Sequence, residues 1–217
     1  MSFDGIFGAL PTQPQEIEDK SFSIITGEIG EHAFSVGEFA VVRRVIHASA
    51  DFELGRSMVF HPLAIESGVR AIRAGRAIVA DVQMVQAGVS KPRIAKYGGD
   101  VHVHISDPDV MAEARRLNTT RAIVAVRKAC ALHEDAIFAI GNAPTALLEL
   151  IRLIREGSAR PSLVIGVPVG FVSAAEAKAE LLELDIPFIT NRGRKGGSPA
   201  AVAAVNALSI LADANDE

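Results

Sequence analysis

Short apolar runs alternate along this chain with longer segments in which apolar residues recur at helical spacing. In the middle of the chain, the apolar run Ala136–Ile140 is broken by Gly141-Asn142-Ala143 and followed by Pro144. A helix can begin at a proline, because a first-turn residue needs no backbone donor. The helix predicted up to Arg155 is followed by a second apolar run at residues 162–165. A strand, a helix and a strand within about thirty residues predict a βαβ unit with parallel strands and a right-handed crossover.

The same alternation extends to both sides of this unit. Further helices are predicted over residues 36–48, 61–75, 108–117, 119–133, 174–184 and 199–211, and further strands over residues 77–80, 101–105 and 186–190. Residues 18–27 suit either a strand or a helix, residues 51–56 suit a turn, and residues 89–100 suit a loop. The sequence therefore predicts one α/β domain, a doubly wound and mainly parallel sheet of about five strands with helices on both faces.

Local signals set the expected limits of several elements. Ser35-Val-Gly-Glu38 and Ser173-Ala-Ala-Glu176 both have the spacing of a capping box, which predicts that helices begin there. Asp81, after the strand predicted at residues 77–80, is expected to cap the segment that follows it. Residues 1–16 are expected to be a poorly ordered extension, residues 17–211 the domain, and residues 212–217 a frayed tail.

Composition narrows the classes of function. Hydrophobic residues make up 49% and charged residues 22% of the chain, which is typical of a soluble globular protein. Aromatic residues make up only 5% and the net charge is −4, so the sequence predicts no nucleic-acid partner. A single cysteine excludes an internal disulfide. No apolar run is long enough to span a bilayer and the N-terminus lacks a signal-peptide pattern, which together predict a cytoplasmic protein with no membrane partner.

The first candidate for chemistry is a helix that carries Arg43, Arg44 and His47. Residues three and four apart lie on one face of a helix, so both arginines can flank the imidazole. A histidine can give or take a proton near neutral pH, and guanidinium groups bind carboxylates. An ordinary amphipathic helix with these residues on its polar face would explain the same spacing.

Other polar segments give weaker signals. Arg192-Gly-Arg194-Lys195-Gly-Gly-Ser198 combines three cations and three glycines between a predicted strand and a helix, which suits an anion site as well as a solvated loop. Asn118-Thr-Thr-Arg121 is similar, although its hydroxyls could simply cap a helix. His102 and His104 share one side of a strand, but no third ligand is apparent, so no metal site is predicted. Several positive, glycine-rich loop ends suit a large ligand with many carboxylates better than a nucleotide.

Six of these segments, in this order, resemble one known family, the precorrin-8X methylmutases of cobalamin biosynthesis. The resemblance extends from about residue 17 to about residue 211. The segments that carry it are Val42-Arg-Arg-Val-Ile-His-Ala48, Asp81-Val-Gln-Met-Val-Gln-Ala-Gly88, Asn118-Thr-Thr-Arg121, Gly141-Asn-Ala-Pro-Thr-Ala146, Gly166-Val-Pro-Val-Gly-Phe171 and Arg192-Gly-Arg-Lys-Gly-Gly-Ser198.

The resemblance implies an isomerase that moves a methyl group from ring carbon 11 to ring carbon 12 of precorrin-8X or cobalt-precorrin-8, giving hydrogenobyrinate or cobyrinate. It implies no cofactor, a tetrapyrrole as substrate, and a homodimer. By position in the motifs, His47 would be catalytic, and Arg44 and Arg121 would bind substrate. Ser21, which precedes Phe22-Ser-Ile-Ile25, matches a further substrate-binding serine of the family. Two alternatives remain at this point, a non-catalytic corrinoid carrier on the same fold and an α/β enzyme with a phosphate ligand.

Overall fold

The computed structural model describes residues 13–214, which belong to two compact units divided between Ala33 and Phe34. In the first unit, α2 (Pro14–Ile29) is a helix with a proline in its first turn, where the missing backbone donor is harmless. Its residues Phe22, Ile25 and Ile29 are buried and recur with helical spacing, which decides the ambiguous segment 18–27 in favour of a helix. The predicted extension, residues 1–16, lies largely outside the described residues.

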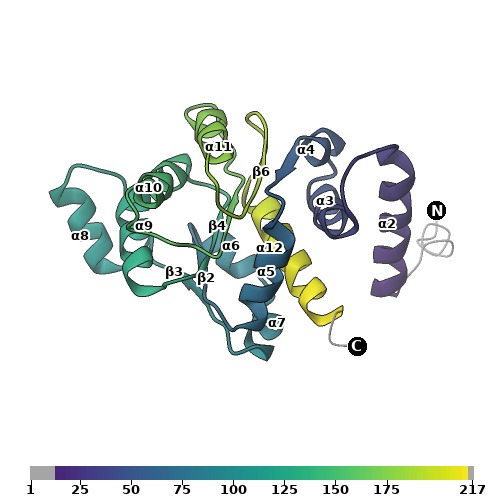
Figure 1. Ribbon diagram of the computed structural model, residues 1–217, viewed down its shortest axis with the longest axis horizontal. Helices are drawn as coiled ribbons and strands as arrows, with labels where there is room; N and C mark the ends of the chain where they lie inside the picture. Colours follow the sequence, from purple (N-terminus) through teal and green to yellow (C-terminus); the bar gives the residue numbers. More distant parts are fainter. Residues whose placement is uncertain (1–12, 215–217) are drawn as a thin grey trace, which may run out of the picture. The chain divides into compact units, whose positions relative to one another are not determined.

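The second unit is an α/β structure built on one six-stranded sheet (Figure 1). Its strands are β1 (Met58–Phe60), β2 (Ile78–Ala80), β3 (Val101–Val103), β4 (Ile137–Ile140), β5 (Leu163–Gly166) and β6 (Phe188–Asn191). Its helices are α3 (Val36–Ser49), α4 (Phe52–Arg56), α5 (Ala64–Arg73), α6 (Gln83–Gly88), α7 (Lys91–Lys96), α8 (Pro108–Arg116), α9 (Arg121–Leu132), α10 (Pro144–Arg155), α11 (Ala174–Leu182) and α12 (Ser198–Ala214).

The strands lie in the order β1-β6-β5-β4-β2-β3. All neighbours are parallel except β1, which runs antiparallel to β6 with Met58 opposite Asn191. The predicted mainly parallel sheet of about five strands is thus confirmed. The sheet has six strands, and β1 is the one that the sequence did not predict. We call the side of the sheet where β2 to β6 end the carboxyl edge, and the antiparallel β1 begins there.

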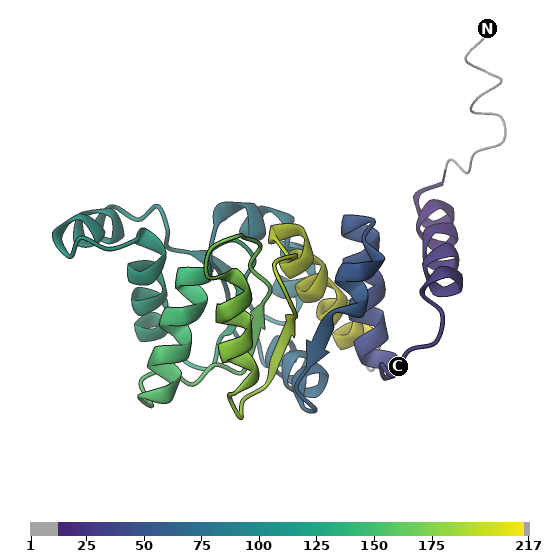
Figure 2. The same ribbon diagram turned by 90° about the horizontal axis from the view of Figure 1, so that it is seen from above.

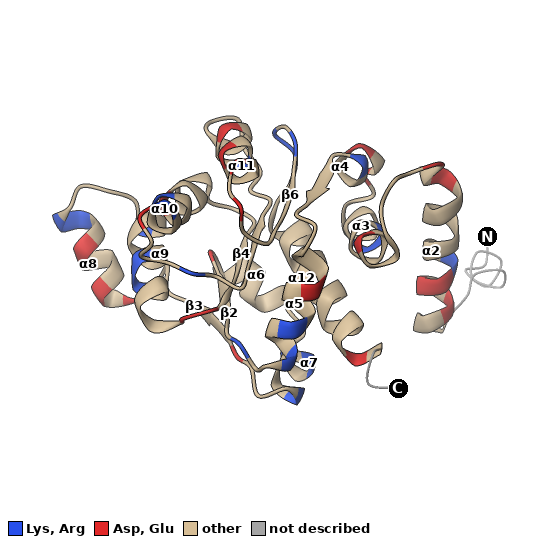
Figure 3. Cartoon of the chain, in the orientation of Figure 1, with Lys and Arg blue, Asp and Glu red and all other residues tan. Residues whose placement is uncertain are grey.

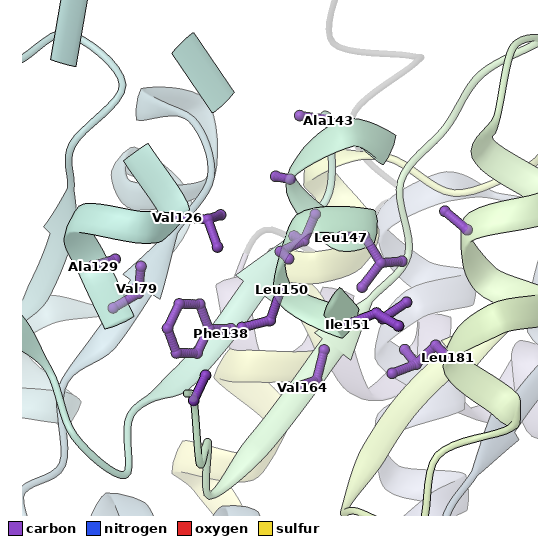
Figure 4. Packing of buried hydrophobic residues seen from close by; sticks show 14 of the residues in the cluster. Val79, Val126, Ala129, Phe138, Ala143, Leu147, Leu150, Ile151, Val164 and Leu181 are labelled. Atoms are coloured by element: carbon purple, nitrogen blue, oxygen red, sulfur yellow. The ribbon is translucent and has the colours of Figure 1, made fainter. Parts of the chain in front are cut away.

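Helices cover both faces of the sheet (Figure 2). The predicted βαβ unit is β4-α10-β5, and α10 packs between α9 and α11 on one face. There Phe138 of β4, Val164 of β5 and Leu147 and Leu150 of α10 are fully buried together with Leu181 of α11 (Figure 4). Each such side chain contributes about 1.5–3 kcal/mol of burial free energy. On the other face, α12 packs against α3, α5 and α6.

Several local predictions need correction. Residues 52–56 form helix α4 rather than a turn, and residues 91–96 form helix α7 within the predicted loop. The first capping box is confirmed, because Glu38 accepts a hydrogen bond from the Ser35 backbone nitrogen at 2.8 Å. The second is absent, since Ser173 is left-handed (φ 61°) and its side chain caps nothing. Among the helices of residues 13–214, none has the length and apolar character needed to cross a bilayer.

Candidate functional site

Helix α3 places Arg44 and His47 at the carboxyl edge of the sheet. Val41, Val42, Val45 and Ile46 are buried and anchor the helix, while Arg44 is half-buried and His47, in the last turn, is exposed. The helix ends at Ala50, a left-handed residue (φ 52°) whose backbone nitrogen donates to the oxygen of Ile46 at 2.7 Å. The structure therefore holds the arginine and the histidine on a rigid element, three residues apart and accessible.

The residues that follow α3 are tied to the loop after β6. Asp51 caps α4 by accepting from the Leu54 nitrogen at 2.9 Å, and its other oxygen lies 2.7 Å from the Lys195 ammonium. Lys195 also pairs with Glu53 at 2.8 Å. The hydrogen bond from Lys195 lowers the pKa of the Asp51 carboxyl below its ordinary value. The structure thus brings the end of α3 close to the loop after β6, although Asp51 and Lys195 are 144 residues apart in the sequence.

We call residues 192–197 the basic loop. Arg192, Arg194 and Lys195 are exposed, and their charges stand out at the turn after β6 in Figure 3. The loop packs against the segment after β5, since the Gly197 nitrogen donates to the oxygen of Val167 at 2.8 Å. At Gly196 (φ 145°), a Cβ atom would lie 2.2 Å from the same oxygen, so only glycine fits.

An exposed apolar surface lies beside the basic loop. Phe171 is 86% exposed and Val172 is also exposed, both in the segment that follows β5. The Arg194 guanidinium carbon lies 5.8 Å from the centre of the Phe171 ring, within the range of a cation–π contact. Apolar surface next to cations suits a ligand that has an apolar ring and an anionic rim.

The turn after β4 is held by a buried carboxylate, for which the sequence predicted a different role. Asp81, at the end of β2, accepts hydrogen bonds from the backbone nitrogens of Gly141 (3.2 Å), Asn142 (2.7 Å) and Ala143 (2.8 Å). Burial raises the pKa of Asp81 and these donors oppose that rise. The prediction that Asp81 caps the segment after it is therefore wrong, because it caps the turn that leads into α10. No sequence signal links residues so far apart.

Arg121 lies in a different part of the carboxyl edge. It is the first residue of α9 and is exposed, and the predicted cap is confirmed, because Thr120 accepts from the Ile123 nitrogen at 3.3 Å. Arg121 lines an open pocket of about 390 Å³ together with Met111, Ala114, Arg115, Asn118 and Thr119. No α3 residue contributes to this lining. The structure thus brings Arg44 and His47 together but does not place Arg121 in one pocket with them.

Ser21 belongs to the first unit, which is described by itself. It is half-buried in α2, and its hydroxyl donates to the backbone oxygen of Ile17 at 2.8 Å. A serine that donates to the preceding turn still has lone pairs available to accept a hydrogen bond.

Three imidazoles gather beside the edge strand β3. The Nε2 atoms of His104 and His133 are 3.1 Å apart, and the rings of His102 and His133 are stacked with centres 4.2 Å apart. His104 is also bonded to Asp107 at 2.9 Å. The third imidazole is the one that the sequence did not reveal. Within residues 13–214, no group of three or more histidine, cysteine or acidic side chains is arranged to hold a metal ion.

Comparisons with known proteins agree with one another. The model of the precorrin-8X methylmutase family matches residues 16–211. The cobalt-precorrin-8 methylmutase of Priestia megaterium is 65% identical over 213 residues, covering 98% of this chain and 95% of that protein. The precorrin-8X methylmutase of a Sinorhizobium species is 38% identical over 195 residues, covering 89% and 92%. The crystal structure of the Thermus thermophilus precorrin-8X methyl mutase superposes with a TM-score of 0.87 at 46% identity, covering 93% and 97%.

Proposed function

The chain belongs to the precorrin-8X methylmutase family, and we propose that it catalyses the methyl shift from ring carbon 11 to ring carbon 12 of a corrin precursor. The structural observation that supports this most directly is the pairing of Lys195 with Asp51 and Glu53. It brings a cationic loop and its apolar neighbour Phe171 close to the segment that follows His47. A polycarboxylate macrocycle needs those three properties in one place: cations, apolar surface and a proton donor.

His47 is the proposed catalytic residue. A methyl shift within a conjugated ring needs no external nucleophile, but it needs the tautomer from which the shift can occur. An exposed imidazole at the end of α3 can exchange a proton with a ring nitrogen of the bound macrocycle and so select that tautomer. Acid–base assistance of this kind is typically worth about a hundred- to ten-thousand-fold in rate.

The peripheral carboxylates are the proposed handles for binding. Arg44 is on the same helix as His47, one turn away, and is half-buried, so a hydrogen bond from its guanidinium group would be partly shielded from water. Arg192 and Arg194 of the basic loop offer two further cations. We propose that Ser21 and Arg121 bind substrate as well, a role supported by their positions in the family motifs.

We propose the cobalt-loaded precursor as the preferred substrate. The relatives from Priestia megaterium and from Methanocaldococcus jannaschii, which is 40% identical over 216 residues, are both named cobalt-precorrin-8 methylmutases. The precorrin-8X methylmutases of Sinorhizobium and Pseudomonas aeruginosa are 38% identical, and the Thermus thermophilus protein of that name is 46% identical, so all three are less similar than the Priestia megaterium enzyme at 65%. In this proposal cobalt belongs to the substrate and the protein itself needs no cofactor.

We also propose a homodimer in the cytoplasm, as the family resemblance implies. Light scattering on a sizing column would then give a mass near twice 22.9 kDa. A monomer at working concentration would contradict the dimer. Fractionation of the source cells would test the compartment.

The test of the function is turnover. Cobalt-precorrin-8 and metal-free precorrin-8X are each supplied in about hundredfold excess over protein, and the absorption spectrum is followed. We expect complete conversion of the cobalt form and slower conversion of the metal-free form. A spectral change that stops at one equivalent per protein would show the alternative, a corrinoid carrier. Equal rates would contradict the preference for cobalt.

A further inference from the structure

Lys178 of α11 is a charged side chain in the protein interior. It is 1% exposed. Burial lowers the pKa of its ammonium group from 10.5 to about 8. Within residues 13–214, no carboxylate forms an ion pair with it, although buried charges are usually paired. An aliphatic residue would fill this position without the penalty of desolvating a charge, so the charge calls for an explanation.

Lys178 contacts the basic loop from the buried side of that loop. Its ammonium donates to the backbone oxygen of Lys195 at 2.6 Å and to the side-chain oxygen of Asn191 at 3.2 Å. Asn191 is fully buried, and its amide nitrogen donates to the oxygens of Arg192 (3.1 Å) and Lys195 (2.9 Å). Two loop carbonyls are therefore held inward by one lysine and one asparagine.

Turning a carbonyl inward turns the next backbone donor outward. A trans peptide unit is planar, and its C=O and N–H groups point in opposite directions. The inward oxygens of Arg192 and Lys195 thus direct the N–H groups of Gly193 and Gly196 away from the interior. Among the described residues, neither of these nitrogens donates to a protein acceptor. The loop therefore presents two backbone donors among exposed cations, and both kinds of group attract an anion.

We propose that Lys178 is a positioning residue, which holds the basic loop so that the N–H groups of Gly193 and Gly196 face a carboxylate of the substrate. The inference rests on the proposed function, because it assigns one of the macrocycle's carboxylates to the basic loop. Lys178 touches no substrate. It acts through the peptide units that it orients, and its buried charge adds to the positive potential beneath the loop.

The experiment compares Lys178→Met, which removes the donors at similar length, with Lys178→Arg, which keeps a charged donor. Glu180→Gln, on the same helix and in an exposed pair with Arg155, is the matched control. We expect Lys178→Met to raise KM about 10- to 100-fold while kcat stays within about threefold. Lys178→Arg should recover part of that loss, and the control should behave as wild type. A merely structural role would lower the melting temperature and the active fraction without changing KM.

A second measurement on the wild-type protein does not depend on whether the variants fold. The amide proton resonances of Gly193 and Gly196 should move downfield when substrate is titrated in, because each would then donate to a carboxylate. Unmoved glycine amides, or an unchanged KM in Lys178→Met, would overturn the proposal. If Arg192→Ala and Arg194→Ala raise KM while Lys178→Met does not, the loop binds substrate and only the role of Lys178 fails. If wild type turns over nothing, the proposed function itself fails.

Discussion

The carboxylate of Asp81, at the end of β2, lies 2.7 Å from the backbone nitrogen of Asn142, which follows β4. This bond and its two neighbours occur where the chain order of the sheet reverses, because β4 lies next to β2 while β3 lies beyond it. Ligands of open α/β sheets bind outside the carboxyl ends at such reversals. Asp81 already occupies the donors of the turn before α10, so that turn is a support for the site rather than a place for a substrate carboxylate.

Asp81→Ala should destabilise the protein. Three backbone donors would lose their acceptor, two of them in buried hydrogen bonds, and we expect a loss of about 3 kcal/mol in the free energy of unfolding. Urea denaturation followed by circular dichroism measures it. Asp100→Ala, which removes an exposed carboxylate, should change the stability by less than about 0.5 kcal/mol. Equal losses of unfolding free energy in the two variants would show that the hydrogen bonds to Asp81 do not stabilise the protein.

His47→Ala should separate catalysis from binding. We expect kcat to fall about a hundred- to ten-thousand-fold, because the proton donor is lost, while the Kd of the substrate changes little. Single-turnover absorption spectra measure the rate, and a spectral titration measures Kd. His61→Gln is the control, since His61 serves as a turn residue whose ring nitrogen accepts from the Leu63 nitrogen at 3.2 Å. Full activity of His47→Ala would refute the catalytic assignment.

Arg44→Ala should weaken binding before it affects chemistry. Loss of one charge-assisted hydrogen bond to a carboxylate should raise Kd about 10- to 100-fold. The matched control is Arg70→Ala, which removes an exposed arginine that pairs with Glu66 on α5. Isothermal titration of both variants compares them directly. An Arg44 variant that binds as tightly as the control would exclude a carboxylate contact.

The imidazole cluster should make stability fall in acid. Burial, and then the charges of His102 and His104, lower the pKa of His133 below 6.5. Because the folded-state pKa is the lower one, the contribution of His133 to stability is present above pH 6.5 and is lost as pH falls through the folded-state value. Asp107 and Lys128 face the same cluster and partly compensate each other.

The measurement for this prediction is thermal melting between pH 5 and 7.5, a range on the order of one unit either side of an ordinary histidine pKa. In His133→Gln, the melting temperature should fall less steeply than in wild type as the pH is lowered. Glu134→Gln, which changes an exposed neighbour, should show the same fall in melting temperature as wild type. If the melting temperature of His133→Gln falls as steeply with pH as that of wild type, His133 is not the cause of the acid sensitivity.

The fold was largely predictable because its signals are local. The βαβ unit of residues 137–166 follows from apolar runs, a proline and a glycine, all within a few residues of the elements they define. The strand β1 was not predicted because Met58–Phe60 lies between a turn signal and a helix signal, and its antiparallel partner β6 lies far away in the sequence. At Ser173 the backbone is left-handed, so the side chain forms no capping hydrogen bond although the sequence has the spacing of a capping box.

The site was predictable only where a residue type suggests a role by itself. Histidine and arginine on one helix, and three cations in a glycine-rich loop, can be recognised in the printed sequence. The burial of Lys178 and the three contacts of Asp81 cannot, since both depend on which strands become neighbours. A lysine in an amphipathic helix is normally solvated, and nothing near residue 178 in the sequence marks it as an exception.

The positions of the basic loop differ in how well they can accept amino-acid substitutions. A side chain at Gly196 would collide with the oxygen of Val167, whereas at Gly193 nothing lies within 4 Å of the added carbon, although its φ of 80° still favours glycine. A library intended to change the macrocycle that this protein accepts should therefore vary residues 192 and 194, and keep Lys195, which ties the loop to Asp51 and Glu53, together with Gly196 and Gly197. New recognition chemistry could then be selected on an unaltered scaffold.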